Sequence, residues 1–196
     1  MKRTICFLLA LLMVILFVGC KKKDTTPQQQ TEPTEEVYDL VECMKNGKIP
    51  ELKYTLGTAA DTIKNDYHYD KVLPEEQLEL VINENPNSIN ISVGDYYFYY
   101  EREKEDKGIS SIVAFTTAFG VEVQGFETKA SLQKKFSKTT FTERKLTSLE
   151  AYFIPGEVEN CSALTCESDN RRIDFIFMDE TLIAINLVDT ENWTLT

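Results

Sequence analysis

The stretch "RRIDFIFMDETLIAINLVD", Arg171 to Asp189, decides the fold of this chain. It contains two apolar runs rich in Ile, Phe and Val, and Asp179 and Glu180 separate them. Two such runs around a short polar turn are typical of a β-hairpin. The sequence therefore predicts an antiparallel sheet at this end of the chain.

The residues before this hairpin predict two further strands and a helix. "EAYFI" (150–154) and "ALTCE" (163–167) have the composition of strands. "ETKASLQKKF" (127–136) is rich in helix formers and places Leu132 and Phe136 one turn apart on one face. The second half of the chain is thus predicted as a helix followed by a four-stranded meander.

The first half repeats this order of elements. "GTAADTIKNDY" (57–67) offers Thr58 as a helix cap and places Ile63 and Tyr67 at the same four-residue spacing. "EREKEDKG" (101–108) is expected to be an exposed turn, and a short helix is expected over residues 37–45. Four apolar or aromatic runs predict strands: "LELVIN" (78–83), "SINIS" (88–92), "DYYFYYE" (95–101) and "ISSIVAF" (109–115).

These two halves predict an α+β fold built as a tandem repeat of a helix followed by a four-stranded antiparallel meander. The repeats are expected over residues 37–120 and 121–196. Each unit alone buries little apolar surface, so the pair is expected to share a core or a continuous sheet.

The order of elements between Lys53 and Asp189, together with "LGT" (56–58) before the first helix, resembles the repeated domains of the β-lactamase-inhibitor-protein and small outer-membrane-assembly lipoprotein type. The resemblance implies a tandem α+β fold. No inhibitory residue of that family can be assigned to this chain. The second unit has "QGFET" (124–128) where the first has "LGT".

The first 19 residues have the layout of a signal peptide. Lys2 and Arg3 precede an almost unbroken apolar run from Ile5 to Val18, and Gly19 follows it. The run is shorter than the roughly 20 apolar residues that span a bilayer. An export signal over residues 1–19 is therefore preferred over a permanent transmembrane helix.

The end of this segment, "LFVGC" (16–20), resembles the lipobox of bacterial lipoproteins, with Phe17 where that family usually has leucine. The resemblance implies cleavage before Cys20, a diacylglycerol on its thiol, and anchoring to the cell membrane on the extracytoplasmic face. Two acyl chains are what lasting attachment requires. The alternatives are a secreted protein with a coincidental cysteine and an uncleaved anchor.

Residues 20–36 are expected to combine the lipid-bearing cysteine with a flexible linker, because Thr, Pro, Gln and Glu dominate them and no large apolar residue follows Cys20 there. Lys21, Lys22 and Lys23 stand where anionic head groups would lie, and they serve either to contact those groups or only to solubilise the segment.

The remaining chain is strongly acidic. From Val37 onward it has 28 Asp and Glu against 16 Lys and Arg, within a total net charge of -11. Such a surface repels phosphate backbones, so nucleic acid is excluded as a partner. The same charge disfavours flat adsorption of the whole domain onto anionic lipid.

Cysteine and histidine offer little chemistry. Cys43, Cys161 and Cys166 remain after the signal and the lipid site, and either Cys161 and Cys166 form a disulfide or all three thiols are reduced. The single histidine, His68, is read as a surface residue. No catalytic residue, metal site or cofactor is predicted, and a non-enzymatic role is preferred over an enzymatic one.

The aromatic run "DYYFYYE" is the candidate binding feature. On a strand, Tyr96, Phe98 and Tyr100 face one way while Tyr97 and Tyr99 face the other. Tyr97 and Tyr99 are the candidate contact residues, unless both faces of the strand are covered.

The expected function is a membrane-anchored cell-envelope lipoprotein that binds a protein or peptide. The alternative is an envelope hydrolase or transport accessory with a carboxylate-lined groove.

Overall fold

The computed structural model describes residues 38–67, 80–147, 150, 153–154 and 160–193. The chain separates into two units, 1–34 and 35–196, and all described residues belong to the second. The expectations for the signal, for Cys20, for the linker and for His68 therefore lie outside the described residues.

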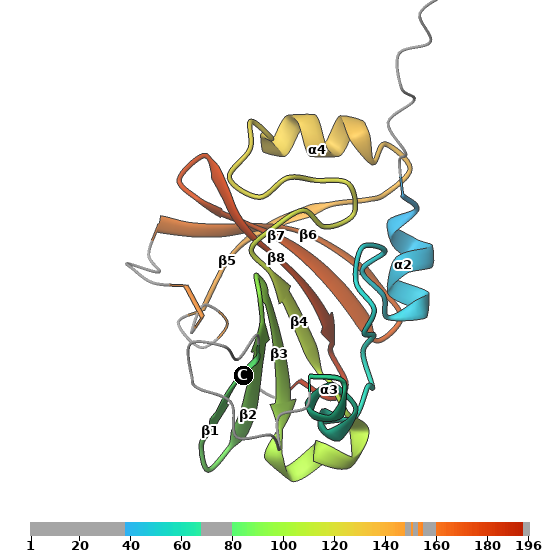
Figure 1. The fold of residues 1–196 in the computed structure, drawn as a ribbon. Helices are drawn as coiled ribbons and strands as arrows, with labels where there is room; N and C mark the ends of the chain where they lie inside the picture. Colours follow the sequence, from blue (N-terminus) through green and yellow to red (C-terminus); the bar gives the residue numbers. More distant parts are fainter. Residues whose placement is uncertain (1–37, 68–79, 148–149, 151–152, 155–159, 194–196) are drawn as a thin grey trace, which may run out of the picture. The chain divides into compact units, whose positions relative to one another are not determined.

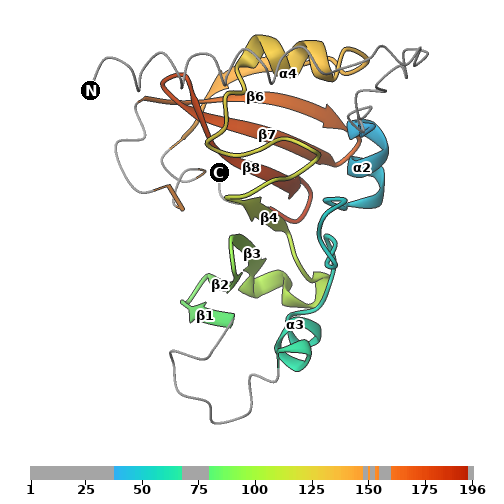
Figure 2. The same ribbon diagram turned by 45° about the horizontal axis from the view of Figure 1, so that its top comes forward.

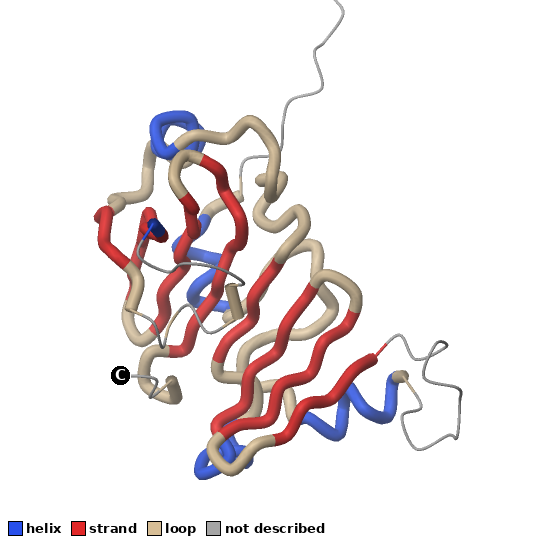
Figure 3. The backbone as a smooth tube through the Cα atoms, turned by 90° about the vertical axis from the view of Figure 1, so that its left-hand side faces the viewer, coloured by secondary structure: helices blue, strands red, loops and turns tan. Residues whose placement is uncertain are grey.

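Eight antiparallel strands form one sheet with the order β1-β2-β3-β4-β8-β7-β6-β5 (Figure 1). Their bounds are β1 Leu80–Glu84, β2 Ser88–Val93, β3 Tyr96–Glu101, β4 Ser111–Ala114, β5 Thr142–Lys145, β6 Cys161–Ser168, β7 Arg171–Met178 and β8 Thr181–Asp189. The four strands of each half follow one another as a meander, and the two meanders meet where β4 pairs with β8. Figure 3 shows the strands of the two halves side by side as one sheet.

The α+β class and the antiparallel pairing are thus confirmed. The two meanders do not form separate modules, because their last strands hydrogen-bond along Ser111↔Val188 to Ala114↔Ile185. A single main core lies on one face of this sheet and takes residues from both halves, among them Phe98, Ile112 and Phe175.

Three short helices pack into that core: α2 (Leu40–Asn46), α3 (Ala60–Asp66) and α4 (Lys129–Lys135). Met44, Ile63 and Leu132, one from each helix, are fully buried in it. α2 contacts β6 and β7. In Figure 2, α2 and α4 lie beside the β5–β8 half, while α3 lies beside the β1–β3 half.

The predicted helix faces are confirmed. Leu132 and Phe136 are buried beside α4, and Tyr67 packs partly against the core one turn after Ile63. α4 begins at a capping box in which Thr128 and Ser131 exchange side-chain and backbone hydrogen bonds. The predicted cap Thr58 is wrong: Ala59 precedes α3, and the Thr58 hydroxyl instead accepts the backbone N–H of Thr55.

The hairpin that decided the fold forms as predicted. Met178 pairs with Thr181 across the two-residue turn Asp179-Glu180, and Asp179 adopts φ 53°. Asp169 does the same in the β6–β7 turn, with φ 52°. Aspartate tolerates this left-handed conformation better than most residues, and two-residue hairpin turns require it.

Two sequence predictions need correction. In "EAYFI", Glu150, Phe153 and Ile154 lie in turns or bends, and the strand before β6 is the polar β5 instead. "EREKEDKG" is not a simple turn, because Arg102–Lys107 forms a 3-10 helix, η2. Polar strands such as β5 carry no apolar alternation, so pattern alone misses them.

Gly108 ends η2 with φ 77° and ψ -154°, a conformation that is essentially restricted to glycine. A Cβ atom on Gly108 would lie 2.2 Å from the carbonyl oxygen of Gly57. Gly57 also donates its N–H to the Ile109 carbonyl at 2.9 Å. The absence of a side chain at Gly108 therefore lets the segment before β4 lie directly against "LGT", the segment before α3.

We predict that Gly108→Ala destabilises the fold by about 3 kcal/mol or more, because it combines a forbidden backbone angle with a direct clash. Gly57→Ala is the matched control: its φ is 83°, but the nearest atom to a new Cβ is 3.8 Å away. It should cost only about 1–2 kcal/mol. Urea unfolding of both variants measures the difference, and equal losses would contradict the close contact.

Candidate functional site

A groove of about 650 Å³ lies at the end of the sheet where β2 turns into β3. The volume is within the range of about 300–1,000 Å³ that is usual for ligand pockets. Four separate segments form its walls: the loop after α2, the end of α3, the β2–β3 turn and the segment after β4. The lining residues are Leu52, Lys53, Tyr54, Tyr67, Val93, Gly94, Asp95, Tyr96 and Thr116. We call this feature the tyrosine groove.

Tyr54 forms the inner wall of the tyrosine groove. Its ring meets Phe98 edge-on with centroids 5.5 Å apart, and its hydroxyl donates to Asp66 Oδ2 at 3.0 Å. Lys53 Nζ lies 2.7 Å from the same oxygen and 5.5 Å from the Tyr54 ring centroid. Burial and the hydrogen bond to Asp66 raise the pKa of Tyr54, so this phenol stays neutral at physiological pH.

Tyr96 and Tyr67 form the outer wall, and both are half-buried. Tyr96 begins β3, and its hydroxyl donates to the Thr117 carbonyl at 3.3 Å. Burial, followed by the charges of Glu51 and Asp95, raises the pKa of Tyr96. Tyr67 ends α3 as its C-cap residue. The groove therefore presents neutral aromatic surface inside a strongly acidic domain.

Among the described lining residues, the tyrosine groove presents more aromatic surface than titratable groups. Asp95 is its one carboxylate and Lys53 its one cation among the described lining residues. Hydrolysis by paired carboxyls requires two such groups held at a defined separation. Aromatic rings with a few polar atoms at their edges are instead suited to recognition.

The two tyrosines selected from sequence lie on the opposite face of β3. Tyr99 is 4% exposed, and its ring lies 4.6 Å from that of Trp193, centroid to centroid. Tyr97 is half-buried, with its ring edge-on to Phe115 at 6.3 Å. Trp193 thus shields Tyr99 from solvent, whereas Tyr97 keeps part of its surface accessible.

The predicted Cys161–Cys166 disulfide does not form. Both cysteines lie in β6 and are free thiols, as is Cys43. Five residues of extended strand separate their Cα atoms by about 16 Å, far beyond the span of a disulfide of about 7 Å. Their side chains point to opposite faces of the sheet, Cys166 into the main core. Burial raises the pKa of Cys166 to about 12 and that of Cys43 to about 11.

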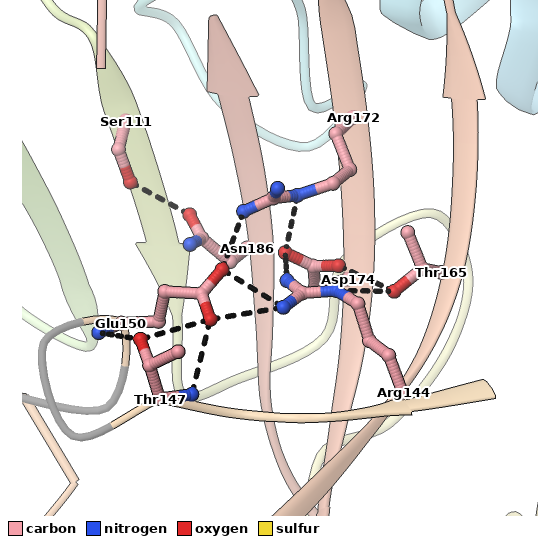
Figure 4. A network of polar contacts seen from close by, with 8 residues as sticks. All are labelled: Ser111, Arg144, Thr147, Glu150, Thr165, Arg172, Asp174 and Asn186. Atoms are coloured by element: carbon pink, nitrogen blue, oxygen red, sulfur yellow. Dashed lines mark hydrogen bonds and ion pairs between the residues drawn. The ribbon is translucent and has the colours of Figure 1, made fainter. Parts of the chain in front are cut away.

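A buried ionic network occupies the face of the sheet opposite the helices (Figure 4). Asp174 is 1% exposed and accepts from three donors: Arg144 Nη2 at 2.9 Å, Arg172 Nε at 2.8 Å and the Thr165 hydroxyl at 2.7 Å. Glu150 accepts from Arg144 Nη1 at 2.8 Å and from Arg172 Nη2 at 3.1 Å. Two arginines and two carboxylates therefore neutralise one another.

Glu150 is held as an anion in this network. Burial acts to raise its pKa, but hydrogen bonds from Arg144 and the Thr147 N–H, with the charges of Arg144 and Arg172, lower it below its ordinary value. A general acid requires a raised pKa instead. Glu150 therefore acts as a fixed anion that braces the sheet and not as a proton donor.

The sequence contained signals for the network that hydrophobic pattern did not use. Thr165, Asp174 and Asn186 each interrupt an apolar strand, and register places them side by side in β6, β7 and β8. Asn186 in turn accepts from the Ser111 hydroxyl at 2.7 Å (Figure 4). The tyrosine groove had no comparable signal, because its walls come from segments distant in sequence.

Within residues 38–67, 80–147 and 160–193 with the short pieces between them, no cluster of three possible metal ligands occurs. No helix of the same residues has the length and apolarity to cross a membrane.

We predict that Glu150→Gln lowers the free energy of unfolding by about 2 kcal/mol at pH 7, because it leaves two partly buried guanidinium groups with less negative charge. The wild-type chain should lose this contribution as the pH falls below about 4.5, since the pKa of Glu150 is lower in the folded state. The variant should lack that part of the acid dependence. Urea unfolding between pH 7 and pH 3 measures both effects.

Glu143→Gln is the matched control, because Glu143 is exposed and pairs with Lys129 at the surface. It should change stability by less than about 1 kcal/mol. If Glu143→Gln and Glu150→Gln behave alike, the network does not brace the sheet.

Comparison with known proteins assigns no family. No family model matches the chain, and no curated protein matches it. Among solved structures, the chain is similar to the crystal structure of YjgB, a DUF4309 family protein from Bacillus subtilis subsp. subtilis str. 168. The sequences are 18% identical, the TM-score is 0.46, and the match covers 77% of this chain and 93% of that one. At this level of similarity, neither a family nor an activity transfers to this chain.

Proposed function

We propose that this protein is a lipid-anchored lipoprotein on the extracytoplasmic face of the cell membrane, and that its α+β domain binds a peptide segment of a partner protein in the tyrosine groove. The observation that carries the binding proposal is the groove itself: about 650 Å³ lined by neutral aromatic side chains from three segments.

The chemistry of the tyrosine groove favours a peptide with apolar or aromatic side chains. Tyr67 and Tyr96 are half-buried, so part of each ring is solvated in the free protein and becomes buried on binding. Tyrosine brings a large contact area with few rotatable bonds, which limits the entropy lost on association. Asp95 at the rim favours a cationic group beside the apolar anchor.

The anchor proposal rests on the sequence "LFVGC" (16–20) and on the linker that follows it. Cys20 would carry the lipid, and residues 21–37 would join it to the domain, whose first described residue is Tyr38. A two-chain lipid supports lasting attachment without a transmembrane helix.

The tandem repeat is also proposed here. Its support is the mirrored strand order, β1 to β4 followed by β8 to β5, with a seven-residue helix before each set of four strands. Ile63 and Leu132 occupy equivalent places in these helices and reach the same core. Duplication of one unit followed by pairing of its last strands would produce this arrangement.

For the groove we predict that Tyr96→Ala raises the dissociation constant for peptide at least tenfold, because it removes one of the two tyrosine rings that form the outer wall. The probe is the consensus peptide selected from a random 12-residue phage library against the full mature chain. Its dissociation constant would be measured by fluorescence anisotropy.

Tyr97→Ala is the matched control, since Tyr97 lies on the same strand, is also half-buried and points to the other face. It should change affinity less than twofold. Loss of binding in Tyr97→Ala with normal binding in Tyr96→Ala would move the site to the face that the sequence indicated.

For the anchor we predict that the membrane-extracted protein begins at Cys20 and carries a diacylglycerol, and that Cys20→Ser abolishes both the modification and retention in the membrane fraction. Intact-mass measurement and cell fractionation test this. A chain of unmodified mass that remains membrane-bound would show that something other than the lipid anchors it.

A further inference from the structure

The segment that contains α4 is richer in lysine than the rest of the domain, although Glu127 and Glu143 border it and Glu143 pairs with Lys129. Residues 128–142 contain four lysines and no Asp or Glu, although the domain as a whole is strongly acidic. The buried side of α4 carries Leu132 and Phe136. The exposed positions of α4 and of the turn that follows it are Ala130, Gln133, Lys134, Ser137 and Lys138. Ala130, Gln133 and Lys134 lie on one side of α4, and Ser137 and Lys138 follow its last residue, Lys135, in a turn. We call these residues the α4 face.

A fully exposed aromatic side chain stands at one end of the α4 face. Phe126 has a relative exposure of 105%, the highest of the exposed large hydrophobic residues in the described chain. It lies two residues before Thr128, the N-cap of α4. A phenylalanine ring that touches nothing in the folded protein gains most when it enters an apolar environment.

The chain reaches the domain beside the other end of the α4 face. Tyr38, the first described residue, lines a cavity of about 290 Å³ together with Asp39, Lys135, Phe136, Ser137, Lys138 and Thr139. The segment that leads from Tyr38 to Cys20 therefore starts next to Lys138. Seventeen residues separate Cys20 from Tyr38. If the segment is flexible, as its composition predicts, a chain of that length spans roughly 25 Å on average.

From these observations we propose that the α4 face and Phe126 form a membrane-docking surface for anionic phospholipid, which orients the tethered domain on the bilayer. The proposal rests on the lipid anchor at Cys20. The exposed lysines supply the charge complementary to the lipid head groups, and Phe126 supplies an apolar contact with the acyl region. The tyrosine groove is held at a fixed orientation to the membrane as a result.

The acidic character of the whole domain does not oppose this docking. At physiological ionic strength the Debye length is about 8 Å, so only charges close to the bilayer surface contribute. Each lysine near an anionic membrane strengthens attachment roughly fivefold. A short tether also keeps the domain at an effective concentration on the order of millimolar at the surface, so a weak patch suffices.

The test places the full lipidated chain in vesicles of phosphatidylcholine, with or without 30% phosphatidylglycerol, whose acyl chains are brominated to quench tryptophan. Phe126→Trp reports on contact, because the native Trp193 is buried and serves as an unquenched reference in the parent chain. The expected result is quenching of the added tryptophan by more than half in vesicles with phosphatidylglycerol, and little quenching without it.

Charge reversal provides the control. Lys134→Glu with Lys138→Glu should weaken the contact at least about 25-fold and abolish quenching. Lys45→Glu with Lys107→Glu makes the same change in net charge at exposed lysines outside the α4 face and should leave quenching intact. Figure 1 shows η2, which ends at Lys107, at the other end of the sheet from α4. Circular dichroism melting confirms that each variant is folded.

Four outcomes overturn the proposal. Equal quenching with and without phosphatidylglycerol removes the electrostatic contact. Equal loss in both double variants shows that net charge, and not the α4 face, controls the contact. Failure of the chain to float with vesicles removes the anchor and the docking surface together, whereas flotation without quenching of Phe126→Trp removes only the docking surface.

Discussion

The pairing of β4 with β8 is the interaction on which the rest of the structure depends. Four residue pairs, Ser111↔Val188 to Ala114↔Ile185, join two meanders that would otherwise each end in an open strand. Around this seam the side chains of both halves fill one core, with Ile112 and Leu187 directly opposite each other and fully buried. Neither half has enough strands or helix cover to bury its apolar face alone.

The two faces of the sheet are stabilised by different means. The helix side is apolar and closely packed, with Phe98 and Phe175 among its largest buried side chains. The other face carries the row Thr165, Asp174 and Asn186, and the two arginines complete its hydrogen bonds. Buried ions of this kind contribute little net stability but strongly favour one arrangement, because any other pairing leaves a charge without a partner. The ionic network thus favours the observed pairing of strands β5 to β8.

Much of the fold could be predicted from the sequence because it follows from local apolar spacing. Ile63 and Leu132 identified the buried faces of two helices, and Asp179-Glu180 identified the central hairpin. β5 was missed because "TERK" carries no apolar residue. Of the two alternatives for the cysteines, the structure has free thiols, and sequence could not decide between them because proximity in sequence says nothing about separation along an extended strand. The tyrosine groove depends on tertiary contacts between Tyr54, Tyr67 and Tyr96, which no pattern of spacing reveals.

Arg144 also has a consequence for how copies of this chain behave toward one another. It belongs to β5, which stands at one margin of the eight-stranded sheet, between Glu143 and Lys145. A marginal strand exposes unpaired backbone groups, and a guanidinium turned onto the sheet face is one of the devices by which proteins prevent a second molecule from adding a strand. An incoming apolar strand beside β5 would lie next to the charged residues Glu143, Arg144 and Lys145, which favours solvent over a second apolar strand at this edge. The residue that completes the ionic network thereby also guards the protein against edge-to-edge aggregation.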